Sequence, residues 1–205
     1  MKSSELWVGG GILWEKKSLG PGPTKLIGGN EEAGFYGEVP TSELITGDEL
    51  SRRIGLNAGT SQYSNEPWLK FSYMGNIEFI AKKPIRYSIS WLELYDTHIV
   101  FGKKIIKINN QEYKVRLIKG KSEWDRLFPP LCGYSEPKWN VKYTNRDLIT
   151  HYWSGSGSYT WCQENGDSTD SKLCRGYEGV MGSIDGNPSD RGYDYGWRPV
   201  LELID

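Results

Sequence analysis

The sequence predicts an α+β fold made of short antiparallel hairpins, short helices and long loops rich in glycine and aromatic residues. The chain has 205 residues, of which 25 are glycine, 13% are aromatic and only 3 are methionine. Aromatic rings pack well on pleated sheets and glycine supplies turn conformations, so this composition favours sheets and loops over a helical bundle. Helix-start signals alternate with hairpin signals, and no strand–helix–strand rhythm indicates a parallel sheet.

Two β-hairpins are predicted from the alternation of apolar and polar side chains on either side of a short turn. The first covers residues 68–81 with its turn at 74–76, and the second covers residues 104–117 with its turn at 109–111. We expect the lysines at the outward positions of these hairpins to lie on solvated strand faces.

Four short helices are predicted from a Ser or Thr that is followed three residues later by an acidic residue. These signals are Thr46–Glu49, Ser90–Glu93, Ser122–Asp125 and Thr144–Asp147. The first residue of each can accept a hydrogen bond from a backbone N–H of the first turn, which has no partner within the helix. Gly55 marks the end of the first helix.

The chain is predicted to have two parts. Residues 1–60 are expected to form an irregular N-terminal docking arm with one short helix, because clusters of Gly and Pro interrupt it about every ten residues. Residues 68–205 are expected to form the α+β domain. Within that domain, residues 151–205 are expected to be mostly long loops, and residues 196–204 a closing strand.

The charge balance and hydropathy exclude several classes of protein. The chain has 25 Lys and Arg against 26 Asp and Glu, a formal net charge of −1, which argues against a protein that coats nucleic acid. No apolar run approaches the ~20 residues of a membrane-spanning helix, and the start of the chain has no apolar signal core. We therefore expect no nucleic-acid partner, no membrane insertion and synthesis in a cytoplasm.

No motif in the sequence predicts catalysis. His98 and His151 are not accompanied by a nucleophile elbow or by metal-ligand spacing, and the Gly-rich segments lack the residues of a phosphate loop. Cys132, Cys162 and Cys174 do not form a CxxC pair, so buried thiols are expected, with a Cys162–Cys174 disulfide as the alternative. We expect neither an enzyme nor a bound cofactor.

One acidic loop is a candidate calcium site. Asp185, Asn187 and Asp190 place several oxygen ligands on a short loop that contains glycine, as a hard cation requires. The loop lacks the bidentate glutamate of a calcium-binding helix–loop–helix motif. The alternative is a set of Asx turns that hydrogen-bond to their own backbone.

The aromatic residues of the C-terminal loops are the candidate binding surface. Tyr and Trp beside Ser, Gly, Asn and Asp combine rigid contact area with adaptable hydrogen bonding, and aromatic rings also stack on sugars. The alternative is that these rings form the core of a loop-rich lobe. The candidate residues are Trp153, Tyr159, Trp161, Tyr177, Tyr193 and Tyr195.

Several segments resemble sequences that recur in virion-associated proteins of tailed bacteriophages. They are residues 34–50, which begin Gly-Phe-Tyr-Gly-Glu-Val-Pro, and residues 81–86, 88–91 and 113–117. The resemblance implies a protein that is assembled in the host cytoplasm and resides in the virion. It also implies other phage virion proteins as partners and multiple copies per particle.

A second resemblance is to the C-type-lectin-like fold, in the branch shared by formylglycine-generating enzymes and phage variable adhesins. Its segments are 122–124 with Glu-Trp, 157–162, 175–177 with Arg-Gly, and 196–200 with Gly-Trp-Arg. The enzymes of this branch need a cysteine pair after the Arg-Gly segment, whereas no cysteine follows Cys174. The resemblance therefore implies a platform that displays loops, without the oxidase activity.

Together these observations predict a structural or accessory component of a tailed phage particle, in the tail, fibre or baseplate region. Its loop-rich domain is expected to recognise a glycan or protein of the host surface. The alternatives are an architectural decoration, collar or tail-fitting protein without a ligand, and a virion-borne cell-wall hydrolase. Docking to the particle is assigned to the apolar residues of the arm, Leu6, Trp7, Ile12, Leu13 and Trp14.

Overall fold

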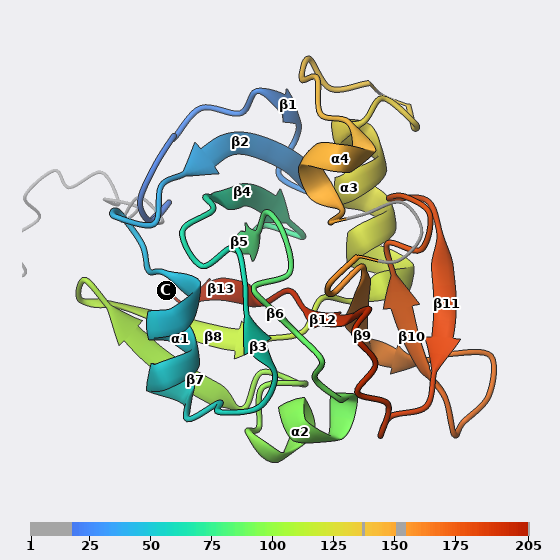
Figure 1. Ribbon diagram of the computed structural model, residues 1–205. Coiled ribbons are helices and arrows are strands. Elements are labelled where there is room, and N and C mark those ends of the chain that lie inside the picture. The colour runs from blue at the N-terminus through green and yellow to red at the C-terminus, as the bar shows by residue number, and fades with distance from the viewer. Residues whose placement is uncertain (1–17, 137, 151–154, 205) are drawn as a thin grey trace, which may run out of the picture.

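The computed structural model describes residues 18–136, 138–150 and 155–204, and it confirms an α+β fold built on two sheets (Figure 1). The larger sheet is antiparallel throughout. Its strand order is β1 (Gly28–Gly29), β2 (Ala33–Val39), β4 (Trp68–Tyr73), β5 (Asn76–Ala81), β13 (Val200–Ile204), β8 (Gln111–Arg116) and β7 (Lys104–Ile108).

The smaller sheet is built mainly from the C-terminal quarter of the chain. It contains one parallel pair, β9 with β12, and its other pairs are antiparallel. Figure 1 shows the chain running from β12 in this sheet directly into β13 in the larger one. The strand order is β11 (Ser183–Gly186), β10 (Lys172–Arg175), β9 (Tyr159–Asn165), β12 (Tyr195–Trp197), β6 (Arg86–Tyr87) and β3 (Thr60–Ser61).

Both predicted hairpins are present, as β4–β5 and β7–β8. Each is closed by a two-residue turn in which both residues have positive φ: Met74 and Gly75 in the first, Asn109 and Asn110 in the second. This backbone conformation matches the right-handed twist of the flanking strands, which is why Gly and Asn are favoured there.

Three of the four predicted helix starts are confirmed. The helices are α1 (Gly47–Ile54), α2 (Trp91–Asp96), the π-helix η1 (Gly120–Trp124), α3 (Asp125–Leu131) and α4 (Asn145–Leu148). Thr46 accepts from the N–H of Glu49, and the capping boxes of α2 and α4 are complete. The third start differs from the prediction, because the π-helix already begins at Gly120 and Ser122 caps neither η1 nor α3.

The larger sheet is covered on both faces. All six residues of β4 are buried, and its hydrophobic side chains are divided between two clusters. Trp68 packs in the cluster with α1 and α2, whereas Leu69 and Phe71 pack in the cluster with α3 and α4. A strand buried on both sides cannot have the solvated face that we expected for this hairpin.

The N-terminal segment differs from the expected irregular arm. Strand β2 pairs with β4 along its whole length, and Phe35 and Val39 are fully buried. Before β2, the carbonyls of Pro21 and Pro23 accept hydrogen bonds from Lys70 of β4. Residues 21–61 therefore belong to the α+β domain, since β2 extends the larger sheet and β3 the smaller one.

The C-terminal segment also differs from the expected long loops, because residues 159–204 contain β9 to β13. The register pairs Cys174 with Trp161, so Cys174 and Cys162 lie in different clusters on opposite faces of the β9–β10 pair. Cys132, Cys162 and Cys174 are free thiols. Burial raises the pKa of all three thiols.

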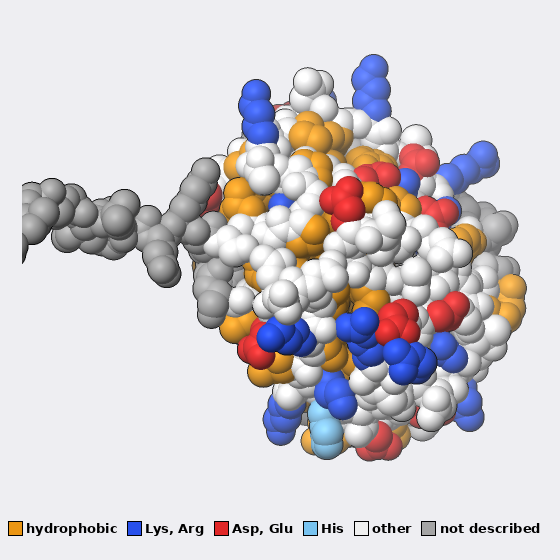
Figure 2. Space-filling view, turned by 90° about the vertical axis from the view of Figure 1, so that its left-hand side faces the viewer, with side chains coloured by type: hydrophobic (Ala, Val, Ile, Leu, Met, Phe, Trp, Pro, Cys, Tyr) orange, Lys and Arg blue, Asp and Glu red, His pale blue; other side chains and the backbone are white. Residues whose placement is uncertain are grey.

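No helix in the part of the chain that the structure describes is long and apolar enough to cross a membrane. Figure 2 shows one face of the molecule, on which basic and acidic side chains are interspersed with hydrophobic ones.

Candidate functional site

Four of the six predicted aromatic residues form a continuous row at the smaller sheet. The ring of Trp161 stacks on Tyr195 with centroids 4.5 Å apart and an interplanar angle of 8°. Tyr195 meets Tyr159 edge to face at 5.6 Å, and Tyr159 contacts Tyr177 at 5.7 Å. Such pairs contribute about 0.5–1.5 kcal/mol each beyond the burial of their area, so this aromatic row has a defined geometry.

Buried and partly exposed rings alternate along the aromatic row. Trp161 and Tyr159 are buried in the larger hydrophobic cluster, while Tyr177 and Tyr195 are partly buried against it. Tyr193 stands apart from the row, with 57% of its surface exposed, and its ring contacts Tyr87. The row therefore has a fixed inner half and an outer half that solvent can reach.

Trp161 cannot act as a surface contact, because it is 0% exposed and its Nε1 donates to the carbonyl of Ile89. Trp153 lies outside the described residues. Four of the six rings named from the sequence are neighbours, but composition gave no signal for which side of each strand faces the core.

Glycine positions allow the aromatic row to form. A Cβ at Gly186 would lie 2.7 Å from the Trp161 ring and 2.8 Å from the Tyr195 ring, which is too close for either stacked partner. A Cβ at Gly196 would lie 2.7 Å from the backbone of Gly157, where the chain before β9 approaches β12. Both glycines are therefore needed for close approach.

The phenols of the aromatic row are neutral hydrogen-bonding groups. Burial raises the pKa of Tyr195, and nearby acidic groups including Asp190 raise it further. Burial and Asp194 raise the pKa of Tyr159. Tyr195 donates to Asp190 Oδ2 at 3.3 Å, which ties the row to the loop that follows β11.

The candidate calcium ligands accept hydrogen bonds from backbone and hydroxyl groups of the surrounding loops. Asp185 accepts from the N–H of Asp167 and from the hydroxyl of Ser171, whereas Asn187 accepts from the N–H and the hydroxyl of Ser189. Asp190 accepts from the N–H of Asn187 at 3.1 Å. Asn187 thus makes the Asx turn of the alternative interpretation, while Asp185 bonds to the loop between β9 and β10. Among the described residues, no three acidic, His or Cys side chains form a metal-binding group.

The predicted docking residues Leu6, Trp7, Ile12, Leu13 and Trp14 all lie outside the described residues. The structure therefore neither places them nor groups them.

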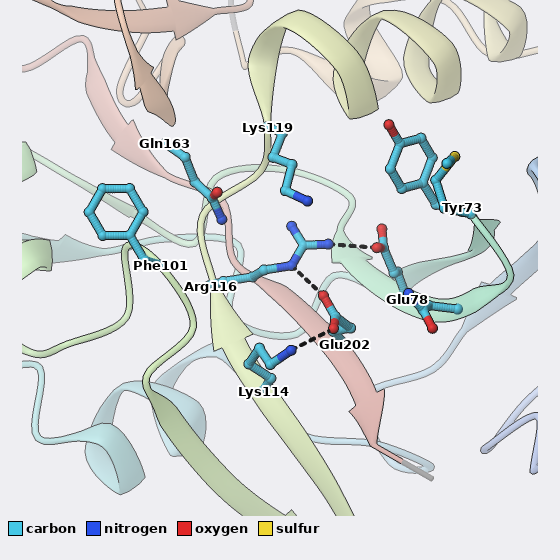
Figure 3. Close-up of a pocket in the computed structure, with 10 residues that line it drawn as sticks. Tyr73, Glu78, Phe101, Lys114, Arg116, Lys119, Gln163 and Glu202 are labelled. Atoms are coloured by element: carbon cyan, nitrogen blue, oxygen red, sulfur yellow. Dashed lines mark hydrogen bonds and ion pairs between the residues drawn. The ribbon is translucent and has the colours of Figure 1, made fainter.

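A second candidate site, which the sequence did not predict, is a polar pocket with a volume of about 240 Å³ (Figure 3). Its walls come from the β4–β5 hairpin, the loop after α2, strand β8 with the segment that leads from it to η1, and strands β9 and β13. Because five separate segments contribute, no local sequence pattern could have indicated it. Its lining includes the charged and aromatic residues Glu78, Phe101, Lys114, Arg116, Lys119 and Glu202.

Arg116 lies at the base of this pocket and uses all five of its N–H donors. Nη2 donates to Glu78 at 2.6 Å and to Glu123 at 2.7 Å, and Nη1 donates to Glu123 and to the carbonyl of Leu117. Nε donates to Glu202 at 2.8 Å. Three carboxyl groups thus surround one buried guanidinium, an arrangement typical of a buried charge with a structural role.

The three carboxyl groups do not titrate alike. Burial and the neighbouring Glu123 raise the pKa of Glu78 well above its usual value, which favours the protonated form of its carboxyl group. Burial opposes ionisation of Glu123, but Arg116 and the hydrogen bond with Glu78 lower its pKa. Bonds from Lys114 and Arg116 likewise lower the pKa of Glu202 against the effect of burial.

Comparison with known proteins gives little further guidance. No protein-family model and no curated protein matches this chain. The chain is similar to the solved structure of Treponema denticola variable protein 1, at 14% sequence identity and a TM-score of 0.37, over 71% of this chain and 91% of that chain. A similarity of this size carries no argument about fold or function.

Proposed function

We propose that this chain is a non-enzymatic, multi-copy component of a tailed bacteriophage particle that presents a C-type-lectin-like domain to the host surface. Its partners would be other virion proteins, and its ligand a glycan or protein of the host. The sequence resemblance of residues 34–50 and 81–91 to virion-associated proteins supports the location.

The lectin-like assignment is supported by the way three of its four sequence segments meet in space. Arg198, from the closing Gly-Trp-Arg segment, stacks its guanidinium over the ring of Trp124 from the Glu-Trp segment, 5.2 Å from the centroid. Arg175, from the Arg-Gly segment, pairs with Asp125 beside that tryptophan. Segments about 20 to 50 residues apart in the sequence thus form one contact group, as motifs of a common fold should.

The observation that carries the recognition role is the exposed outer half of the aromatic row. Tyr177 and Tyr195 are held from behind by the buried Tyr159 and Trp161, and Tyr193 protrudes beside them. Tyrosine rings fixed in this way lose little conformational entropy on binding, which is why they are effective contact residues.

A second candidate function is a purely architectural role in the particle. It is favoured by the burial of Tyr159 and Trp161, which makes the inner half of the aromatic row part of the core. On this interpretation the row stabilises the smaller sheet and has no ligand.

The first test is the location of the protein in the particle. Antibody raised against the full chain is used for immunogold labelling of purified particles, with mass spectrometry of the same preparation. Gold at the tail or fibre ends is the result expected for a recognition protein, and gold over the head or collar supports the architectural role. Particles that contain none of the protein contradict both.

The second test uses the adsorption of the purified full chain to host cells. Tyr193→Ala should weaken adsorption about tenfold, because an exposed contact ring at the centre of an interface contributes on the order of 1–2 kcal/mol. Tyr134→Ala is the matched control, since Tyr134 is similarly exposed on the loop after α3. Equal adsorption by both variants would exclude the exposed surface at Tyr193 as part of the recognition surface.

A further inference from the structure

The polar pocket beside Arg116 is separate from the aromatic row and draws on different elements. It opens between the β4–β5 turn, Phe101 and strand β13, and it encloses about 240 Å³. Pockets for drug-sized molecules are about 300–1,000 Å³, so this one suits a smaller ligand, of the size of a single sugar ring.

One positive charge in this pocket has no partner. Lys114 is paired with Glu202 at 2.8 Å, and Arg116 is saturated by its three carboxyl groups. Lys119 also lines the pocket, and among the described residues its Nζ has neither a hydrogen bond nor an ion pair. Figure 3 shows this side chain directed toward the pocket, near the guanidinium of Arg116.

The charge balance favours a ligand with a single negative charge. Three basic and three acidic groups form the cluster when Glu123 behind Arg116 is included, and the proton on Glu78 leaves an excess of one positive charge. A doubly charged phosphate would meet the ionised Glu202, which faces the same space. A carboxylate, which carries a single charge, therefore suits this pocket better than a doubly charged phosphate.

The remaining walls suit a ring that carries hydroxyl groups. Phe101 is 52% exposed and offers a flat apolar face at the rim. Gln163 donates through Nε2 to the carbonyl of Leu117 at 2.9 Å, and its amide oxygen accepts no hydrogen bond from another described residue. An aromatic face with amide and charged groups around it is the combination that recognises a polyhydroxylated ring.

We propose that this pocket binds a sugar acid of the hexuronate class, with its carboxylate on Lys119, its hydroxyl groups on Gln163 and its ring against Phe101. The site is independent of the proposed virion role and of the aromatic row. A free sugar acid and the end of an acidic polysaccharide present the same chemistry to it.

The test is calorimetric titration of the full chain with sodium glucuronate, glucose and sodium acetate at low ionic strength. Glucuronate should bind, and glucose and acetate should each bind at least tenfold more weakly, because each lacks one of the two recognised features. Added salt should weaken glucuronate binding, as expected for an exposed ion pair. Tetragalacturonate is titrated in parallel. If it binds more tightly than the monomer, the ligand is the end of an acidic polysaccharide. If it does not, the ligand is a free sugar acid.

The variants locate the site. Lys119→Ala should weaken glucuronate binding about tenfold or more, since it removes a hydrogen bond between charged groups. Lys121→Ala is the matched control, because Lys121 is exposed two residues away and does not line the pocket. Equal binding of glucose and glucuronate, or an equal effect of the two lysine variants, would overturn the proposal.

Discussion

Arg116 determines the electrostatics of the interior between β5, β8 and β13. Its guanidinium is almost completely buried, and it hydrogen-bonds to Glu78, Glu123 and Glu202 from three other segments of the chain. Removing a buried charge of this kind leaves its partner charges uncompensated, which commonly lowers the free energy of unfolding by about 3–5 kcal/mol. The proton held by Glu78 is what allows three carboxyl groups to share one guanidinium without strong repulsion.

This protonation predicts a pH-dependent stability that Glu78→Gln should remove. Folding raises the pKa of Glu78, so above pH 4.5 the folded state holds a proton that the unfolded state has lost. The stability from this group is therefore complete below its unfolded pKa and declines as the pH rises toward the folded value. A glutamine at this position can accept from Arg116 and donate to Glu123 at every pH.

We expect Glu78→Gln to match the wild-type melting temperature near pH 4.5 and to exceed it at pH 8. Glu123→Gln is the control with the opposite sign, because Glu123 is the charged member of the pair. Thermal unfolding of both variants across this pH range is the measurement. An equal loss of stability in both variants at pH 8 would show that Glu78 is ionised in the folded state.

At the scale of single elements, helix starts depend on whether the side chain actually reaches the backbone. Ser90 accepts from the N–H of Glu93 at 3.2 Å, and Glu93 accepts from the N–H of Ser90 at 2.9 Å. Ser122 has the same sequence signal, but the π-helix has already begun two residues earlier. The N–H of Trp124, from which a cap at Ser122 would accept, donates instead to the carbonyl of Lys119.

A pair of serine substitutions tests this difference. Ser90→Ala should lower the free energy of unfolding by about 1 kcal/mol, the usual cost of losing a helix N-cap. Ser122→Ala should change it by less than about 0.5 kcal/mol, as for a surface substitution without a special role. Urea denaturation measures both, and an equal effect of the two substitutions would contradict the assigned caps.

The whole molecule is held together by strands that are distant in sequence. The larger sheet joins residues 28–39 to residues 68–81 through β2–β4, and it joins β5 to β8 through the C-terminal strand β13. The first sixty residues also supply buried side chains of α1, including Leu50 and Ile54. Cutting the chain near residue 60 would therefore expose one edge of β4 and part of both hydrophobic clusters.

We predict that a fragment of residues 68–205 does not fold on its own. The loss of β2 and α1 uncovers Phe71 and Trp68, which are fully buried in the intact chain. A chain of residues 18–205 keeps every described element and is the control. Circular dichroism with thermal denaturation compares them, and cooperative unfolding of the shorter fragment near the melting temperature of the longer one would contradict the prediction.

Local signals in the sequence determined the two hairpins, three of the helix starts and the α+β class, because turn residues and caps act within a few positions of the chain. The grouping of aromatic residues in the C-terminal quarter was also visible in the sequence. Only the tertiary structure decided that β2 belongs to the larger sheet, that Trp161 faces the core while Tyr193 faces solvent, and that Arg116 gathers Glu78 and Glu202. These partners are separated by tens of residues, and pairing over such distances is set by the packing of whole sheets.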